Sequence, residues 1–127
     1  MAAAGARIVF VMAANEAEAS AMARALVEER LAACVNLITA VRSIYRWRGV
    51  IEESSECLML IKTSSRCYQE LERRIKQLHS YEVPEIVAAT LTNGSADYLK
   101  WIAESTTQSA EFARKPASAV RRSPSRN

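Results

Sequence analysis

The sequence has few of the residues on which most enzyme and cofactor sites depend. Its 127 residues include three glycines, three prolines and one histidine. Neither a Walker A sequence nor a G-x-G-x-x-G loop is present, which excludes these two kinds of nucleotide-binding loop. With one histidine, most hydrolase mechanisms would depend on His79 alone. We therefore expect no enzymatic activity, no catalytic residues and no organic cofactor.

Long apolar runs are also missing. No run reaches the ~18–20 residues that a membrane-spanning helix needs. The N-terminus lacks the basic segment followed by an apolar segment that marks a signal peptide. Half of the residues are nevertheless hydrophobic, enough for the core of one domain. We expect no membrane association and a cytoplasmic location.

The three cysteines do not form a recognisable metal or redox motif. Cys34, Cys57 and Cys67 are odd in number, and no two stand at C-x-x-C spacing. If residues 34–63 form a hairpin that turns near Gly49, Cys34 and Cys57 are not cross-strand partners. We expect all three to be reduced and mostly packed in the interior.

Positive charge is concentrated at the C-terminal end. The net charge is +3, but residues 108–127 carry five cations and one carboxylate, so the preceding residues sum to −1. The folded part therefore has no basic excess, and we expect no nucleic-acid binding. The tail could touch nucleic acid or acidic partners, although a solvated extension is the simpler interpretation. We predict a domain at 1–107 and a basic, disordered tail at 108–127.

The hydrophobic pattern predicts strands that alternate with helices. Asn15, with Glu18 three residues later, resembles a capping box that opens a helix reaching about Ala33, with Ala19, Met22 and Leu26 inside. The remaining signals are a strand at 7–14, a period-two segment from Cys34 to Trp47, a turn at Arg48-Gly49, a strand at 50–63, a helix capped by Ser64 or Ser65 and ending near Leu78, a strand at 85–92, and a short helix capped by Ser95.

This order predicts an α+β, ferredoxin-like β-α-β-β-α-β sandwich with a short C-terminal helix. Both main helices should cover one face of a four-stranded antiparallel sheet. In the long hairpin, strict alternation places one set of side chains on a single face: Val35, Leu37, Thr39, Val41, Ser43, Tyr45 and Trp47.

The hairpin is too long for its own helices to cover. Fourteen strand residues span roughly 46 Å, whereas a fifteen-residue helix spans about 22 Å. The distal part, Ser43 to Glu53, should therefore project with apolar residues exposed: Ile44, Tyr45, Trp47, Val50 and Ile51. Exposed strands of this kind need a partner, and the economical one is a homo-oligomer in which hairpins add to neighbouring sheets.

Side chains that can bind a metal ion or act as an acid or base are concentrated in residues 79–86, between the predicted second helix and the last strand. His79 is a candidate metal ligand, with Glu82 or Glu85 supplying oxygen. The alternative is a helix-end histidine beside two glutamates that pair with basic residues such as Lys62. A less favoured interpretation is that Glu82 and Glu85 act as a paired acid and base.

A cleft between subunits is the second candidate site. Its predicted residues are Tyr45, Trp47, Lys62, Tyr81 and Trp101. Lys62 near Tyr81 and Glu85 could bind a small anion there. Aromatic interface packing explains the same residues without a ligand.

Five stretches together resemble the CutA family, the proteins associated with divalent-cation tolerance. They are Leu26-Val-Glu-Glu-Arg-Leu-Ala-Ala-Cys-Val-Asn36, Ser43-Ile-Tyr-Arg-Trp47, Ile61-Lys-Thr63, Tyr81-Glu-Val-Pro-Glu-Ile86 and Tyr98-Leu-Lys-Trp-Ile102. The resemblance covers roughly residues 7–105. It implies a ferredoxin-like fold, a homotrimer resembling the PII signalling proteins, and binding of Cu(II) or another divalent cation.

The chain departs from the family pattern at three positions. Ser80 stands where the family usually has a proline, and Thr90 where it often has one. Met12 stands where some members have a cysteine proposed as a metal ligand, and its thioether favours Cu(I) over Zn(II). Three hypotheses follow: a homotrimeric divalent-cation tolerance protein with a metal site at His79, Glu82 and Glu85, a PII-like regulatory trimer that binds a small anion, or a structural interaction module.

Overall fold

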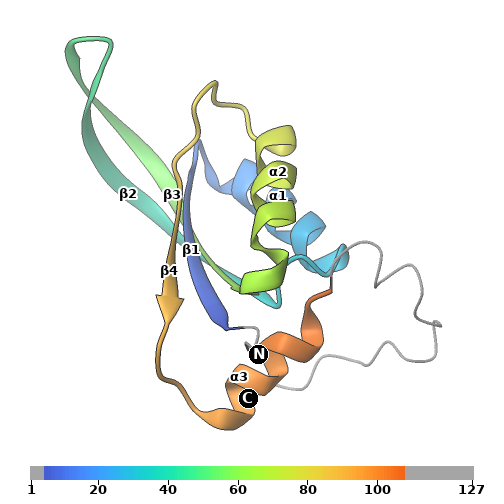
Figure 1. Ribbon diagram of the computed structural model, residues 1–127. Coiled ribbons are helices and arrows are strands. Elements are labelled where there is room, and N and C mark those ends of the chain that lie inside the picture. The colour runs from blue at the N-terminus through green and yellow to red at the C-terminus, as the bar shows by residue number, and fades with distance from the viewer. Residues whose placement is uncertain (1–4, 108–127) are drawn as a thin grey trace.

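The computed structural model describes residues 5–107 and confirms the predicted α+β fold (Figure 1). The predicted basic tail at 108–127 lies outside the described residues. No helix within residues 5–107 has the length and apolar character to cross a membrane. The elements are β1 (Ala6–Ala13), α1 (Glu16–Glu28), β2 (Cys34–Trp47), β3 (Val50–Ser64), a single 3-10 turn η1 (Ser65–Cys67), α2 (Tyr68–Leu78), β4 (Ile86–Leu91) and α3 (Ala96–Ser105).

The four strands form one antiparallel sheet in the order β2-β3-β1-β4. As predicted, α1 and α2 lie on the same side of this sheet, and α3 packs at its lower end in Figure 1. Alternate residues of β1 and β3 pack against the apolar stripes of the two helices. The main residues of the core are Val9, Val11, Ala19, Met22, Leu26, Met59, Ile61, Leu71 and Ile75.

The first helix begins where the sequence predicts but ends earlier. Asn15 Oδ1 accepts a hydrogen bond from the Glu18 backbone nitrogen at 2.8 Å, which confirms the N-cap. The predicted end near Ala33 is wrong, because α1 stops at Glu28. The chain reverses at Arg30, whose φ is 64°, and Ala33 then donates from its backbone nitrogen to the sheet. Helical periodicity alone does not reveal this left-handed residue.

Of the two serines predicted to cap the second helix, Ser64 occupies the N-cap position of the 3-10 turn that leads into α2, and Ser65 is the first residue of that turn. Ser64 is the last residue of β3 and makes no side-chain capping bond to the 3-10 turn that precedes α2. Its hydroxyl instead accepts from Thr106 Oγ1 at 3.0 Å, 42 residues away in sequence. This buried contact fastens the end of α3 to the sheet. By contrast, Ser95 does cap α3, accepting from the Tyr98 backbone nitrogen at 3.2 Å.

A bulge in the hairpin overturns the prediction of strict alternation. Partners run from Cys34 opposite Lys62 to Ile38 opposite Leu58, and then shift by one residue, so that Val41 lies opposite Glu56. Ala40 in the bulge has φ of 61°. One extra residue turns every later side chain of a strand to the other face.

The bulge therefore separates two sets of side chains that strict alternation places together. Val35 and Leu37 pack on the core beneath α1 and α2. Beyond the bulge, Tyr45 lies opposite Glu52 and its hydroxyl is 3.3 Å from Ser54 Oγ. The end of the hairpin thus turns its aromatic side chains to the face that carries no helix.

We call this helix-free side of the sheet the open face. Its strand positions alternate with the core residues of β1, β3 and β4. It consists of the apolar, partly or fully exposed side chains Ile8, Phe10, Met12, Leu58, Leu60 and Val87. A contiguous apolar surface of this kind marks an interaction site.

The end of the hairpin projects beyond the two helices, as its length predicts (Figure 1). Arg48 and Gly49 form the tight turn, both with positive φ, as a two-residue hairpin loop requires. The predicted apolar side chains at this end are exposed: Ile44, Tyr45, Trp47, Val50 and Ile51.

The cysteine prediction is confirmed. Cys34, Cys57 and Cys67 are all buried, and none forms a disulfide. Cys57 lies within the core and Cys67 at the start of α2. Burial raises the pKa of the Cys57 thiol, and the nearby Glu16 carboxylate adds to this effect. The three thiols act as packing groups.

Candidate functional site

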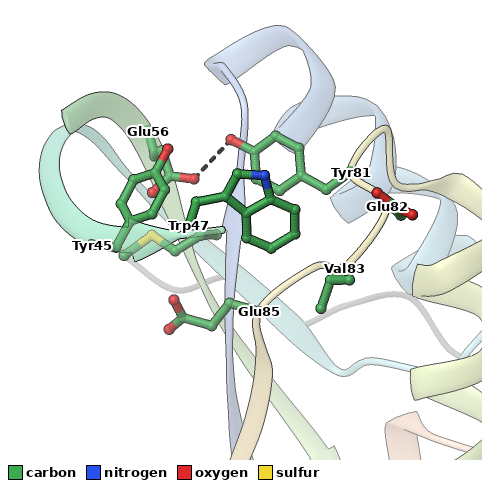
Figure 2. Close-up of a pocket in the computed structure, with 8 residues that line it drawn as sticks. Tyr45, Trp47, Glu56, Tyr81, Glu82, Val83 and Glu85 are labelled. Atoms are coloured by element: carbon green, nitrogen blue, oxygen red, sulfur yellow. Dashed lines mark hydrogen bonds between the residues drawn. The ribbon is translucent and has the colours of Figure 1, made fainter. Parts of the chain in front are cut away.

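A pocket of about 410 Å³ lies between the projecting hairpin and the loop that follows α2 (Figure 2). We call it the hairpin–loop pocket. It is lined by Met12, Tyr45, Trp47, Glu56, Tyr81, Glu82, Val83 and Glu85. The hairpin, the end of β1 and the loop before β4 each supply part of its wall. Its volume falls within the range of small-molecule sites.

His79 fixes the start of the loop. It follows the last residue of α2, and its backbone nitrogen still donates to Ile75 O at 2.9 Å. Its ring Nε2 lies 2.7 Å from Met12 O, and its Nδ1 accepts from the Tyr81 backbone nitrogen at 3.1 Å. This pairing corresponds to a neutral imidazole that donates from Nε2 and accepts at Nδ1. The histidine therefore braces the loop against the end of β1.

Glu18 anchors the same loop from α1. Its carboxylate accepts from the Ser80 backbone nitrogen at 2.7 Å and from the Ser80 hydroxyl at 3.0 Å. It also accepts from the Ala14 backbone nitrogen at 3.2 Å. Partial burial would raise the pKa of Glu18, but the bonds from Ser80 and Ala14 favour the carboxylate, and the net pKa lies below its ordinary value.

The lowered pKa of Glu18 predicts an acid-sensitive contribution to stability. Its stabilising effect is present above the ordinary value of 4.5 and is lost as pH falls through the lower, folded-state pKa. Glu18→Gln should reduce the free energy of unfolding by about 1–2 kcal/mol at pH 7, because a neutral amide replaces a carboxylate that accepts three hydrogen bonds. Thermal unfolding at pH 7 and at pH 3 measures it, with the exposed Glu28→Gln as control. If Glu18→Gln lost as much stability at pH 3 as at pH 7, the effect could not be assigned to the ionised Glu18 carboxylate.

Tyr81 and Glu56 form a hydrogen-bonded pair in the wall of the hairpin–loop pocket. The Tyr81 hydroxyl donates to Glu56 Oε2 at 2.7 Å, as the dashed line in Figure 2 shows. Glu56 is 9% exposed. Burial raises the pKa of Tyr81 well above its usual value, and the hydrogen bond and charge of Glu56 raise it further. Tyr81 therefore remains a neutral donor beside a carboxylate through the physiological pH range.

Arg48 lies at the rim of the hairpin–loop pocket. Its Nη2 donates to Glu82 Oε1 at 2.9 Å, and its guanidinium carbon is 5.2 Å from the Trp47 ring centroid. Both charged side chains are mostly solvent-exposed. An exposed pair of this kind contributes little to stability and is screened by salt.

The structure brings together some of the predicted site residues and separates others. Tyr45, Trp47 and Tyr81 line one pocket with Glu82 and Glu85. Lys62 does not reach this pocket and instead contacts Asn36 across the hairpin. Trp101 lies on α3, with its ring centroid 5.4 Å from that of Tyr98. The anion site expected from Lys62 beside Tyr81 and Glu85 is therefore not assembled within one subunit.

The predicted metal ligands do not form a three-residue group within one subunit. Among residues 5–107, no group of three or more His, Cys, Asp or Glu side chains is placed to hold a metal ion. The His79 side chain is fully buried, and both ring nitrogens have partners inside the subunit. The carboxylates of Glu82 and Glu85 are exposed. The metal role of these three residues stays a prediction.

Sequence reasoning did not identify Glu56 as a site residue. It lies in β3, two residues before Leu58, in a polar stretch that reads as an exposed hairpin edge. Its partner Tyr81 is 25 residues away in sequence, so no local pattern links the two. A carboxylate on the same strand face as Leu58 and Leu60 was the available signal, since a charge in an apolar row requires a partner.

Comparisons with known proteins give one consistent result. Residues 7–105 match the sequence model of the family described as CutA1 divalent ion tolerance protein. The Thermus thermophilus divalent-cation tolerance protein CutA is 46% identical over 99 residues, covering 78% of this chain and 96% of that protein. A mouse protein CutA is 50% identical over 93 residues, covering 73% of this chain and 52% of the mouse protein.

A solved structure agrees with the sequence comparisons. The Thermus thermophilus divalent cation tolerance protein superposes with a TM-score of 0.79 at 45% identity, covering 80% of this chain and 99% of that one. The chain therefore spans nearly all of the bacterial relative but about half the length of the mouse relative.

Proposed function

This chain belongs to the CutA1 family of divalent ion tolerance proteins, and on that premise we propose that it is a homotrimer that binds divalent cations at its subunit interfaces. We propose Cu(II) or a similar ion as the ligand, and a binding role without enzymatic activity. The curated relatives are named as tolerance proteins or as CutA, which supports a binding role.

The observation that carries the metal proposal is the charge of the hairpin–loop pocket. Glu56, Glu82 and Glu85 line it, and carboxylate oxygens serve as ligands of divalent cations, including Cu(II) in tetragonal sites of mixed nitrogen and oxygen ligands. Because one subunit does not supply a three-ligand group, we propose that a neighbouring subunit completes the coordination. Met12 adds a thioether to the wall, a ligand type suited to Cu(I).

The observation that supports the homotrimer is the apolar open face. It lies beside the hairpin–loop pocket, since Met12 belongs to both. The projecting hairpin adds exposed apolar side chains at its end. Packing open faces together around a closed symmetry axis would bury both surfaces and bring several pockets to the interfaces.

Copper titration tests the metal proposal. Wild type should take up Cu(II) at the pockets, and the double variant Glu82→Gln, Glu85→Gln should lose roughly tenfold or more in affinity, since charged ligands dominate binding of a divalent ion. Isothermal titration calorimetry measures this, with Glu28→Gln as the matched control. Equal uptake by wild type and the double variant would refute the site. Equal copper uptake by wild type and His79→Ala would show that His79 is not a ligand.

The geometry does not favour the alternative of a regulatory trimer that binds a small anion in this pocket. Three carboxylates line the pocket, and Lys62 lies outside it. A like-charged ligand would be repelled there. We further propose a cytoplasmic location, which the three reduced thiols support.

A further inference from the structure

We propose that the hairpin–loop pocket also binds a small organic ammonium cation, such as a quaternary or protonated alkylamine. This ligand class differs from the divalent metal ion of the proposed function, and the argument does not depend on metal binding. It follows from the aromatic side chains of the pocket, which a hydrated metal ion does not need.

The pocket has the composition of an aromatic cage. Tyr45 and Trp47 come from the hairpin and Tyr81 from the facing loop, and all three line the same hollow (Figure 2). Met12 and Val83 complete an apolar wall. Aromatic faces attract organic cations, with Trp the strongest, and alkylated ammonium groups are bound in this way.

The charge inside the pocket complements such a ligand. Glu56 is a buried carboxylate on the wall, and one of its oxygens, Oε2, accepts from Tyr81. Because Tyr81 stays neutral and donates, it fixes the carboxylate without cancelling its charge. Glu85 adds a second, exposed carboxylate from the loop before β4. Within residues 5–107, no Lys or Arg lines the pocket.

The chain already places one of its own cations against this rim. The Arg48 guanidinium lies 5.2 Å from the Trp47 ring centroid and donates to Glu82 at 2.9 Å. Arg48 therefore makes both interactions that an external cation would make, one with an aromatic ring and one with a carboxylate. Its side chain is 69% exposed, so a ligand can displace it without opening the core.

Tryptophan fluorescence provides a direct test, because the chain has two tryptophans and one of them, Trp47, lies in the pocket. In the variant Trp101→Phe, Trp47 is the sole reporter. Choline chloride should change its emission saturably, with EDTA present to remove metal ions and sodium chloride matching the ionic strength. The uncharged isostere, in which a tert-butyl group replaces the trimethylammonium group, should not. In the variant Trp47→Leu, choline should not change the emission of the remaining tryptophan, Trp101 on α3.

Four variants assign the interaction. Calorimetric titration should show roughly tenfold weaker choline binding for Trp47→Leu, and weaker binding for Glu85→Gln, while Glu28→Gln binds like wild type. Arg48→Gln should bind more tightly, because the competing internal cation is gone. A decrease in affinity for Arg48→Gln would contradict its role as a competitor.

Two results would overturn the proposal. One is an equal response to choline and to the uncharged isostere, which would show an apolar pocket without cation recognition. The other is no response in a folded protein, as judged by circular dichroism. Val87→Glu places a charge on the open face and is therefore expected to be monomeric. If this variant responds to choline and wild type does not, a neighbouring subunit fills the pocket and the proposal fails for the assembled protein. Copper uptake without EDTA tests the metal function separately.

Discussion

Phe10→Glu is expected to leave the protein monomeric, because it should prevent assembly of the proposed homotrimer. Phe10 lies in the middle of the open face, between Leu60 of β3 and Val87 of β4 in the sheet register. The proposed trimer buries this face, so each subunit would carry an unpaired carboxylate into an apolar interface. An uncompensated buried charge costs several kcal/mol, and a trimer contains three copies. Assembly at about micromolar concentration should therefore fail, since each 1.4 kcal/mol is about tenfold in an association constant.

Sedimentation velocity measures the assembly state, and two further variants make the result decisive. Val27→Glu introduces the same charge on α1, at a side chain that is 40% exposed and away from the open face, and should remain trimeric. Val87→Glu charges an open-face side chain that is 53% exposed, so it should dissociate the trimer without affecting the fold of the subunit. A trimeric Val87→Glu, or a monomeric wild type, would exclude the open face as the interface.

Leu26→Ala is expected to reduce the free energy of unfolding by about 2–5 kcal/mol. Leu26 is fully buried in the core, on the inner stripe of α1. Truncation removes the transfer free energy of its side chain and leaves a cavity that the packed sheet cannot fill. The surroundings are also fixed by hydrogen bonds, because the backbone nitrogens of Leu31 and Ala32 donate to Leu26 O at 2.9 and 3.1 Å. The site therefore has little freedom to collapse.

Urea unfolding in the Val87→Glu background measures this effect, because a monomer has a stability that does not depend on protein concentration. The neighbouring Val27→Ala is the matched control. Val27 is 40% exposed on the same helix, so its truncation should change the free energy by less than about 0.5 kcal/mol. Similar losses for the two variants would show that the core is not centred on the inner stripe of α1.

The elements that the sequence predicts correctly depend on interactions between near neighbours. The caps at Asn15 and Ser95 each accept a bond from a residue three positions later, so the signal and the structure lie in one short window. The hairpin turn at Arg48-Gly49 is equally local. The helix end near Ala33 was wrong because the reversal at Arg30 depends on a single left-handed residue that is not a glycine.

The sequence by itself determined the order of elements, the core stripe of α1 and the family. Only the tertiary structure decided the site, for two physical reasons. The bulge at Ala40 adds one residue without changing the hydrophobic pattern, yet it turns Tyr45 and Trp47 away from the core and into the pocket. The contacts that shape the pocket also join residues far apart in sequence: Tyr81 with Glu56, Ser80 with Glu18, and His79 with Met12. Such pairings are chosen by the packing of the whole sheet, and no local propensity specifies them.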